Sequence, residues 1–427
     1  MKNKLFQFKE YYAKSTIDRK ILLFVLITSL IITVVFLVKI PFNGFWIWGG
    51  NLAFAETGQF GDFIGGVIGT IFSGAAFYFL YVTLVEQRFA SISQSESFER
   101  ERLESRFFEL IKMHRENVSE FKFNAIKHIA NENSMQIEKK EYEGKSVFNI
   151  IFKQFVICRN ELEPFFRMKR VYESSYKTKL AQNEFVKKHN ISLSLLAKID
   201  ICYSIVFYGV GSEGLILLRE KFKGRYKEKF VNDILNFISL KPAENNEIIL
   251  KWEKVLVKSS KGKKIKITND ILYKRSENKF RDDNGSDNHI IDNYHNKFVK
   301  YYGGHQFRLG HYYRHLFQTV KYINEQEKLN YKQKYEYIKI LRAQLSTYEQ
   351  TILLLNSLSS MGYSWEVIPD VNSDLKKYNK IDFNLITKYN LIKNISGDTI
   401  FGLPFKIFYP EIEYEGSDLK RDNSQYN

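Results

Sequence analysis

Residues 21–38, ILLFVLITSLIITVVFLV, and residues 63–85, FIGGVIGTIFSGAAFYFLYVTLV, contain no charged side chain. At about 1.5 Å per residue, helices of these lengths approach or exceed the roughly 30 Å hydrocarbon core of a bilayer. Phe45, Trp46 and Trp48 lie between the two runs and are typical of a membrane interface. The pattern predicts a transmembrane hairpin with helices at 21–40 and 61–85 and a short external loop at 41–60.

Basic residues lie both before and after this hairpin in the sequence. They are Lys2, Lys4, Lys9, Lys14, Arg19 and Lys20 before it, and Arg88, Arg100, Arg102 and Arg106 after it. The connector carries only Lys39, so the positive-inside rule predicts that both termini are cytoplasmic. The alternative is a cleaved signal peptide, for which 53–55 (Ala-Phe-Ala) offers a cleavage site. The first apolar run is longer than a signal-peptide core, and that site lies far beyond its end.

Small residues recur every four positions in the second span, at Gly61, Gly65, Gly69 and Ser73. This spacing lets helix backbones approach closely within a bilayer. It is compatible with packing of the second span on the first and with self-association into a homo-oligomer. A pore is a further alternative.

The sequence outside the hairpin predicts a mainly α fold with minor β structure. Only 6 prolines occur in 427 residues, and apolar side chains recur at helical spacing. We expect a basic cytoplasmic tail at 1–20, a long stalk helix at 86–130, a large helical cytoplasmic domain at 131–362 and a C-terminal tail region at 363–427. Within that domain, helices are expected at 305–325 and 331–361. The 2 cysteines indicate no disulfide framework, which fits a reducing compartment.

The net charge of +16 favours an anionic partner, either the inner leaflet of a membrane or RNA. A generally solvated basic surface would give the same charge. The densest basic patch, at 258–266, contains Lys261, Lys263, Lys264 and Lys266. These lysines are candidate phosphate contacts, although the same pattern fits the solvated tip of a hairpin.

No nucleotide-binding glycine loop, zinc-protease motif or hydrolase elbow occurs in the sequence, and we expect no cofactor. The richest run of reactive side chains is 301–317, YYGGHQFRLGHYYRHLF. On a helix, Arg308, His311 and His315 fall on a face away from the apolar stripe, so they are candidate catalytic residues. A network that only packs helices is an alternative, as is a metal bound by His305, His311 and His315.

The spacing of Arg308 and His315 resembles the R-x(4–6)-H motif of the HEPN superfamily of metal-independent ribonucleases. That resemblance implies RNA cleavage at a site that is usually completed across a dimer. It covers only this short motif.

Three blocks resemble the phage abortive infection (AbiC-type) family. They are FGDFIGGVIG (60–69) continued to TLVEQ (83–87), ESRFFELIKMH (104–114) and GHQFRLGHYYRHLF (304–317), and no resemblance extends beyond about residue 363. The resemblance implies a protein of the bacterial inner membrane that halts growth or kills the infected cell, and a phage-encoded trigger is then an expected partner. It brings no defined catalytic residues.

Three hypotheses follow from these observations. The chain is a membrane-tethered ribonuclease, a non-enzymatic effector whose glycine-rich span permeabilises the membrane, or a scaffold that binds a phage component.

Overall fold

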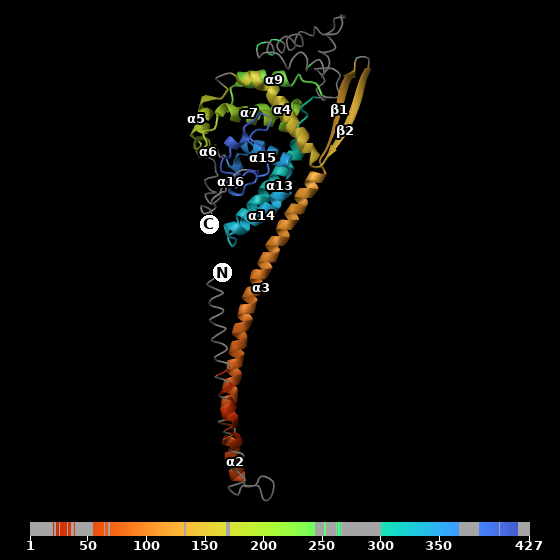
Figure 1. Cartoon of the computed structure of the whole chain (residues 1–427). Coiled ribbons are helices and arrows are strands. Elements are labelled where there is room, and N and C mark those ends of the chain that lie inside the picture. The colour runs from red at the N-terminus through yellow and green to blue at the C-terminus, as the bar shows by residue number, and fades with distance from the viewer. Residues whose placement is uncertain are drawn as a thin grey trace. The chain divides into compact units, whose positions relative to one another are not determined.

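The structure is a computed structural model of the 427-residue chain (Figure 1). It describes residues 54–63, 65–66, 69–131, 134–167, 171–243, 300–366, 384–400 and 402–416, with isolated residues between 20 and 38 and at 252, 262, 264 and 266. The chain divides into two units, Met1–Ser105 and Arg106–Asn427. Each unit is described by itself below.

The first unit contains α2 (Phe54–Phe63) and most of α3 (Gly69–Ser119). Among the described residues, one helix is long and apolar enough to cross a membrane, and this helix is α3. Its apolar side chains are largely exposed, among them Phe72, Phe77, Phe79, Leu80, Tyr81 and Leu84. The core helix of a water-soluble protein would bury such side chains, so this exposure suits a lipid environment. The described residues between 23 and 38 are helical, and the rest of the first predicted span lies outside the described residues.

The helix α3 ends at Ser119, not near residue 130 as expected for the stalk. Residues 122–131, which we expected to continue it, form β1 (Lys122–Asn131), which pairs antiparallel with β2 (Ser134–Glu143). The reason is a change of period: Phe121 and Phe123 turn inward while Lys122 and Asn124 are exposed, which is the alternation of a strand. The prediction of a helix up to residue 130 was therefore wrong.

Three helices form the centre of the second unit. They are α4 (Ser146–Phe166), α7 (Leu193–Tyr208) and α15 (Thr347–Leu358), which pack on one another. Almost every residue of α7 from Leu196 onward is buried, as expected for a helix that is apolar on all sides. Around this centre lie α5 (Ser174–Gln182), α6 (Glu184–Lys188) and α9 (Glu228–Ile238) (Figure 1). The helix α8 (Ser212–Phe222) packs on α7 and α9.

The helix α13 (Gln306–Asn324) confirms the expected helix at 305–325, and its apolar stripe is buried as predicted. The expected helix at 331–361 is instead two helices, α14 (Tyr331–Ala343) and α15. The break comes from a capping box at Ser346. Its hydroxyl accepts from the Glu349 N–H at 3.3 Å, while the Glu349 carboxylate accepts from the Ser346 N–H at 2.7 Å.

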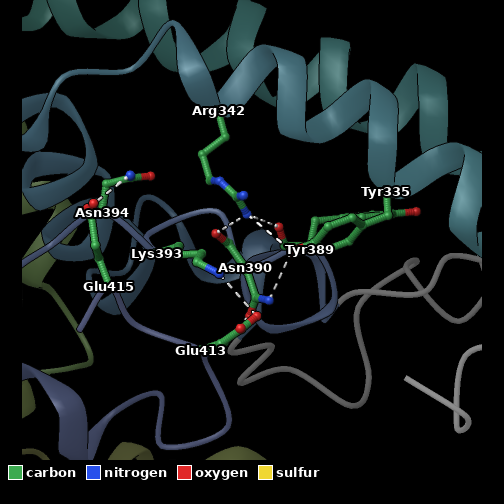
Figure 2. Close-up of polar contacts among 8 residues, drawn as sticks. All are labelled: Tyr335, Arg342, Tyr389, Asn390, Lys393, Asn394, Glu413 and Glu415. Carbon is green, nitrogen blue, oxygen red and sulfur yellow. Dashed lines mark hydrogen bonds and ion pairs between the residues drawn. The ribbon is translucent and has the colours of Figure 1, made fainter. Parts of the chain in front are cut away.

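Residues 384–400 and 402–416 contribute to the core of the second unit, which differs from the separate C-terminal tail region expected at 363–427. This segment contains α16 (Leu385–Lys388), and it buries Leu391, Ile392, Phe405, Phe408 and Ile412 completely. Figure 2 shows how it is held. The Arg342 guanidinium of α14 donates to the carbonyl oxygens of Tyr389 at 3.2 Å and Asn390 at 3.0 Å.

Candidate functional site

Two glycines fix the start of α13 against the end of α7. Two main-chain hydrogen bonds join these two segments. The His305 N–H donates to Phe207 O at 2.8 Å, and the Val210 N–H donates to Tyr302 O at 2.8 Å. A Cβ atom on Gly304 would lie 2.7 Å from Tyr208 O, and one on Gly209 would lie 2.7 Å from Gly303 C. Gly209 and Gly304 also have φ values of +77° and +89°. Only glycine fits these positions, so the crossing is rigid.

His305, at the N-terminus of α13, is a buried structural histidine. Its Nε2 lies 2.8 Å from Gln154 Oε1 and its Nδ1 lies 3.2 Å from a guanidinium nitrogen of Arg308. This arrangement requires a neutral ring that donates from Nε2 and accepts at Nδ1. Burial, together with the charge of Arg308, lowers the pKa of His305 to about 3. The ring therefore stays neutral at physiological pH.

The Arg308 side chain is also held by the fold. Its Nε donates to the carbonyl oxygen of Lys122 at 3.1 Å, and Nη2 donates to the same oxygen. Its guanidinium also lies over the Phe307 ring, 4.0 Å from the centroid. Arg308 therefore joins α13 to the first residue of β1.

His315 lies beside a histidine of α3 rather than beside Arg308. The rings of His114 and His315 are stacked with centroids 6.3 Å apart, and among the described residues neither ring has a hydrogen-bond partner. Burial, followed by the charge of His315, lowers the pKa of His114 to about 4, and burial also lowers the pKa of His315. No contact in the described part of the chain joins Arg308 to His315.

His311 is exposed and lines an open cavity of about 390 Å³. Arg314 and Glu213 line the same cavity, together with Tyr208 and the glycine crossing. An imidazole, a guanidinium and a carboxylate around one solvent-open space can bind an anion and move protons. Of the three candidate catalytic residues, His311 is therefore the one that the structure places in a described cavity.

The candidate phosphate contacts in the basic patch separate in the structure. Lys264 is fully buried, and its Nζ donates to the main-chain oxygen of Glu161 at 2.7 Å. Lys266 is exposed, while Lys261 and Lys263 lie outside the described residues. Lys264 thus packs in the core instead of facing a ligand.

The glycine-rich span shows an open face where it is described. A Cβ atom on Gly61, Gly65, Gly66 or Gly74 would meet no atom of a described residue within 4 Å. Among the described residues, no group of three or more histidine, cysteine or acidic side chains could hold a metal ion, so His305, His311 and His315 form no such group.

The family comparison coincides with this region. Residues 304–399 match the family model described as "Putative phage abortive infection protein". The match confirms the resemblance for the block at 304–317, whereas the blocks at 60–69, 83–87 and 104–114 lie outside it. It runs past residue 363, where we had expected the resemblance to end. It begins at the glycine crossing and covers α13, α14, α15 and the first half of the docked C-terminal segment. No curated protein and no protein of solved structure matches the chain.

The family match supports a role in phage abortive infection.

Sequence reasoning on α13 missed Arg314 and Glu213 as partners of His311. Arg314 stands three residues after His311 in the same run, so helical spacing could have found it. Glu213 comes from α8, and no local spacing connects it to α13.

Proposed function

We propose that the chain is a membrane-anchored abortive infection protein that stops the growth of an infected bacterium by cleaving RNA. The match of residues 304–399 to the abortive infection family carries the defence role. The exposed apolar surface of α3 supports the anchor, and the basic residues on both sides of the predicted hairpin support cytoplasmic termini. The protein is thus proposed to act from the inner face of the cytoplasmic membrane.

The cavity around His311 supports the RNA-cleaving part of this proposal. The exposed imidazole of His311 can act as a general acid or base, and Arg314 can neutralise a phosphate in the same cavity. Arg308 and His315 then act by holding α13 in place. This assignment departs from the HEPN-like spacing, in which Arg308 and His315 would themselves meet the substrate.

Infection of cells that express the variants tests this proposal. In wild-type cells we expect RNA fragmentation to precede any loss of membrane potential. His311→Ala should keep RNA intact, because we expect it to lower the rate of RNA cleavage by about 100-fold or more. Lys332→Ala, an exposed change on α14, is the matched control and should behave as wild type. Intact RNA in growth-arrested wild-type cells would rule out the ribonuclease.

A membrane effector is the second candidate, and the open face of Gly61, Gly65, Gly66 and Gly74 favours it. In that case the glycine face associates between copies and permeabilises the membrane after a phage component is sensed. Gly65→Leu should then prevent depolarisation, whereas His311→Ala should leave it unchanged. Early depolarisation in Gly65→Leu cells would count against this mechanism.

A further inference from the structure

Two cavities meet along one side of α13. The first, of about 390 Å³, contains His311, Arg314 and Glu213. The second, of about 240 Å³, is lined by Phe207, Leu309, Tyr313, Phe317, Asn356, Met361, Ser364 and Trp365. Gly310 and Arg314 line both. The two cavities therefore lie next to each other along α13, and we call the pair the groove, with a polar end, an aromatic end and Arg314 between them.

The aromatic end suits a flat ring that carries polar edges. Phe317 and Trp365 pack edge to face there, with centroids 4.9 Å apart. The buried Asn356 amide and the Ser364 hydroxyl line the same space. Aromatic side chains beside a few polar groups are the usual surroundings of a bound nucleobase.

The polar end suits a sugar phosphate. Arg314 and His311 are exposed, and no ion pair joins either of them to another described residue. A guanidinium binds phosphate through two parallel hydrogen bonds. The Glu213 carboxylate would repel a phosphate, but it can accept hydrogen bonds from ribose hydroxyl groups, as acidic side chains do in dinucleotide sites.

We propose that this groove binds one nucleotide unit, with its base at Phe317 and Trp365 and its phosphate at Arg314. An apolar peptide is a poorer occupant, because it would leave the cation at the junction without a charge partner. The unit is either a free mononucleotide or one residue of single-stranded RNA. The inference shares His311 with the proposed ribonuclease, but binding does not require cleavage.

Gly310 makes this groove testable without breaking the fold. A Cβ atom at this position would meet only the far end of the Phe207 ring, at 4.0 Å, which is an ordinary contact. Gly310→Ala should therefore be tolerated, and alanine also favours the helix. Gly310→Leu would extend into the groove.

The experiment is equilibrium binding to the full chain in detergent micelles, with AMP, GMP, adenosine, inorganic phosphate and a six-nucleotide adenosine RNA as probes. We expect a nucleotide to bind at least about tenfold more tightly than adenosine or phosphate alone, because each of these lacks one half of the contacts. Binding of AMP or GMP makes a free nucleotide the ligand. Binding of the RNA alone makes RNA the ligand, and either result supports the groove.

Variants of groove residues test whether the ligand binds in this groove. Arg314→Ala and Gly310→Leu should each weaken binding at least about tenfold, while Lys332→Ala, outside the groove, should not. Thermal unfolding of each variant checks that it is folded. The inference is overturned if no probe binds at millimolar concentration, if phosphate binds as well as AMP, or if folded Gly310→Leu binds as wild type. A wild-type protein that binds AMP but leaves RNA intact in infected cells would remove the ribonuclease and keep the groove.

Discussion

At the scale of single residues, Glu366 is a buried carboxyl whose protonation is coupled to folding. The main-chain N–H groups of Ile386 and Thr387 donate to its Oε2 at 3.1 and 3.2 Å. Burial nevertheless raises its pKa from 4.5 to about 8. The folded chain thus holds a proton between about pH 4.5 and 8 that the unfolded chain has lost, so this group makes the folded state less stable as the pH rises through that window.

Glu366→Gln should remove this dependence, because a glutamine can accept the same two hydrogen bonds without a charge. We expect the free energy of unfolding of Glu366→Gln, minus that of wild type, to rise by about 1.4 kcal/mol per pH unit between pH 5 and 8. Urea titrations across this range measure it. Glu336→Gln, at an exposed position on α14, is the control and should run parallel to wild type. A parallel course for Glu366→Gln would show that the carboxyl is ionised in the folded protein.

At the scale of elements, the crossing of α7, α8 and the start of α13 depends on backbone contact. A Cβ atom on Gly214, in the first turn of α8, would lie 2.6 Å from Tyr208 O, whereas one on Gly211 would meet nothing within 4 Å. We expect Gly214→Ala to lower the free energy of unfolding by about 1–3 kcal/mol, through displacement of the helix. Gly211→Ala should change it by less than about 1 kcal/mol. Equal effects in thermal or urea unfolding would show that the crossing can relax.

The elements that sequence predicted well are those whose pattern is local. The stripe from Leu309 to Ile323 has helical period, and α13 is the helix it predicted. The error at 331–361 was avoidable, because Ser346 and Glu349 have the spacing of a capping box. The end of α3 at Ser119 was missed because the apolar period changes within a few residues, which a long helical window averages out.

The candidate site was only partly predictable for a related reason. Arg308, His311 and His315 share one run of sequence, and spacing alone placed them on one face. The structure separates their partners: Lys122 O holds Arg308, His114 lies beside His315, and Glu213 shares a cavity with His311. These partners come from distant segments, so no local pattern contains them.

At the scale of the whole molecule, the family match and the core of the second unit end in the same C-terminal segment. The match continues to residue 399, and the buried side chains continue beyond it to Tyr414. The polar stretch at 370–382, DVNSDLKKYNKID, hides this segment in the sequence, because it separates the segment from the helices on which it packs. Contacts such as Arg342 with Asn390 O join it to α14.

Substitutions at two isoleucines of this segment test whether it is a structural part of the domain. Ile392 is completely buried, whereas Ile407 is 44% exposed. Ile392→Asp would bury a carboxylate among apolar side chains at a cost of several kcal/mol, comparable with the whole stability of a domain. We expect it to abolish both the cooperative unfolding transition and phage resistance, while Ile407→Asp retains both. If the segment were a peripheral tail, proteolysis and thermal unfolding would show the two variants to be equally stable, and infected cells carrying either would survive alike.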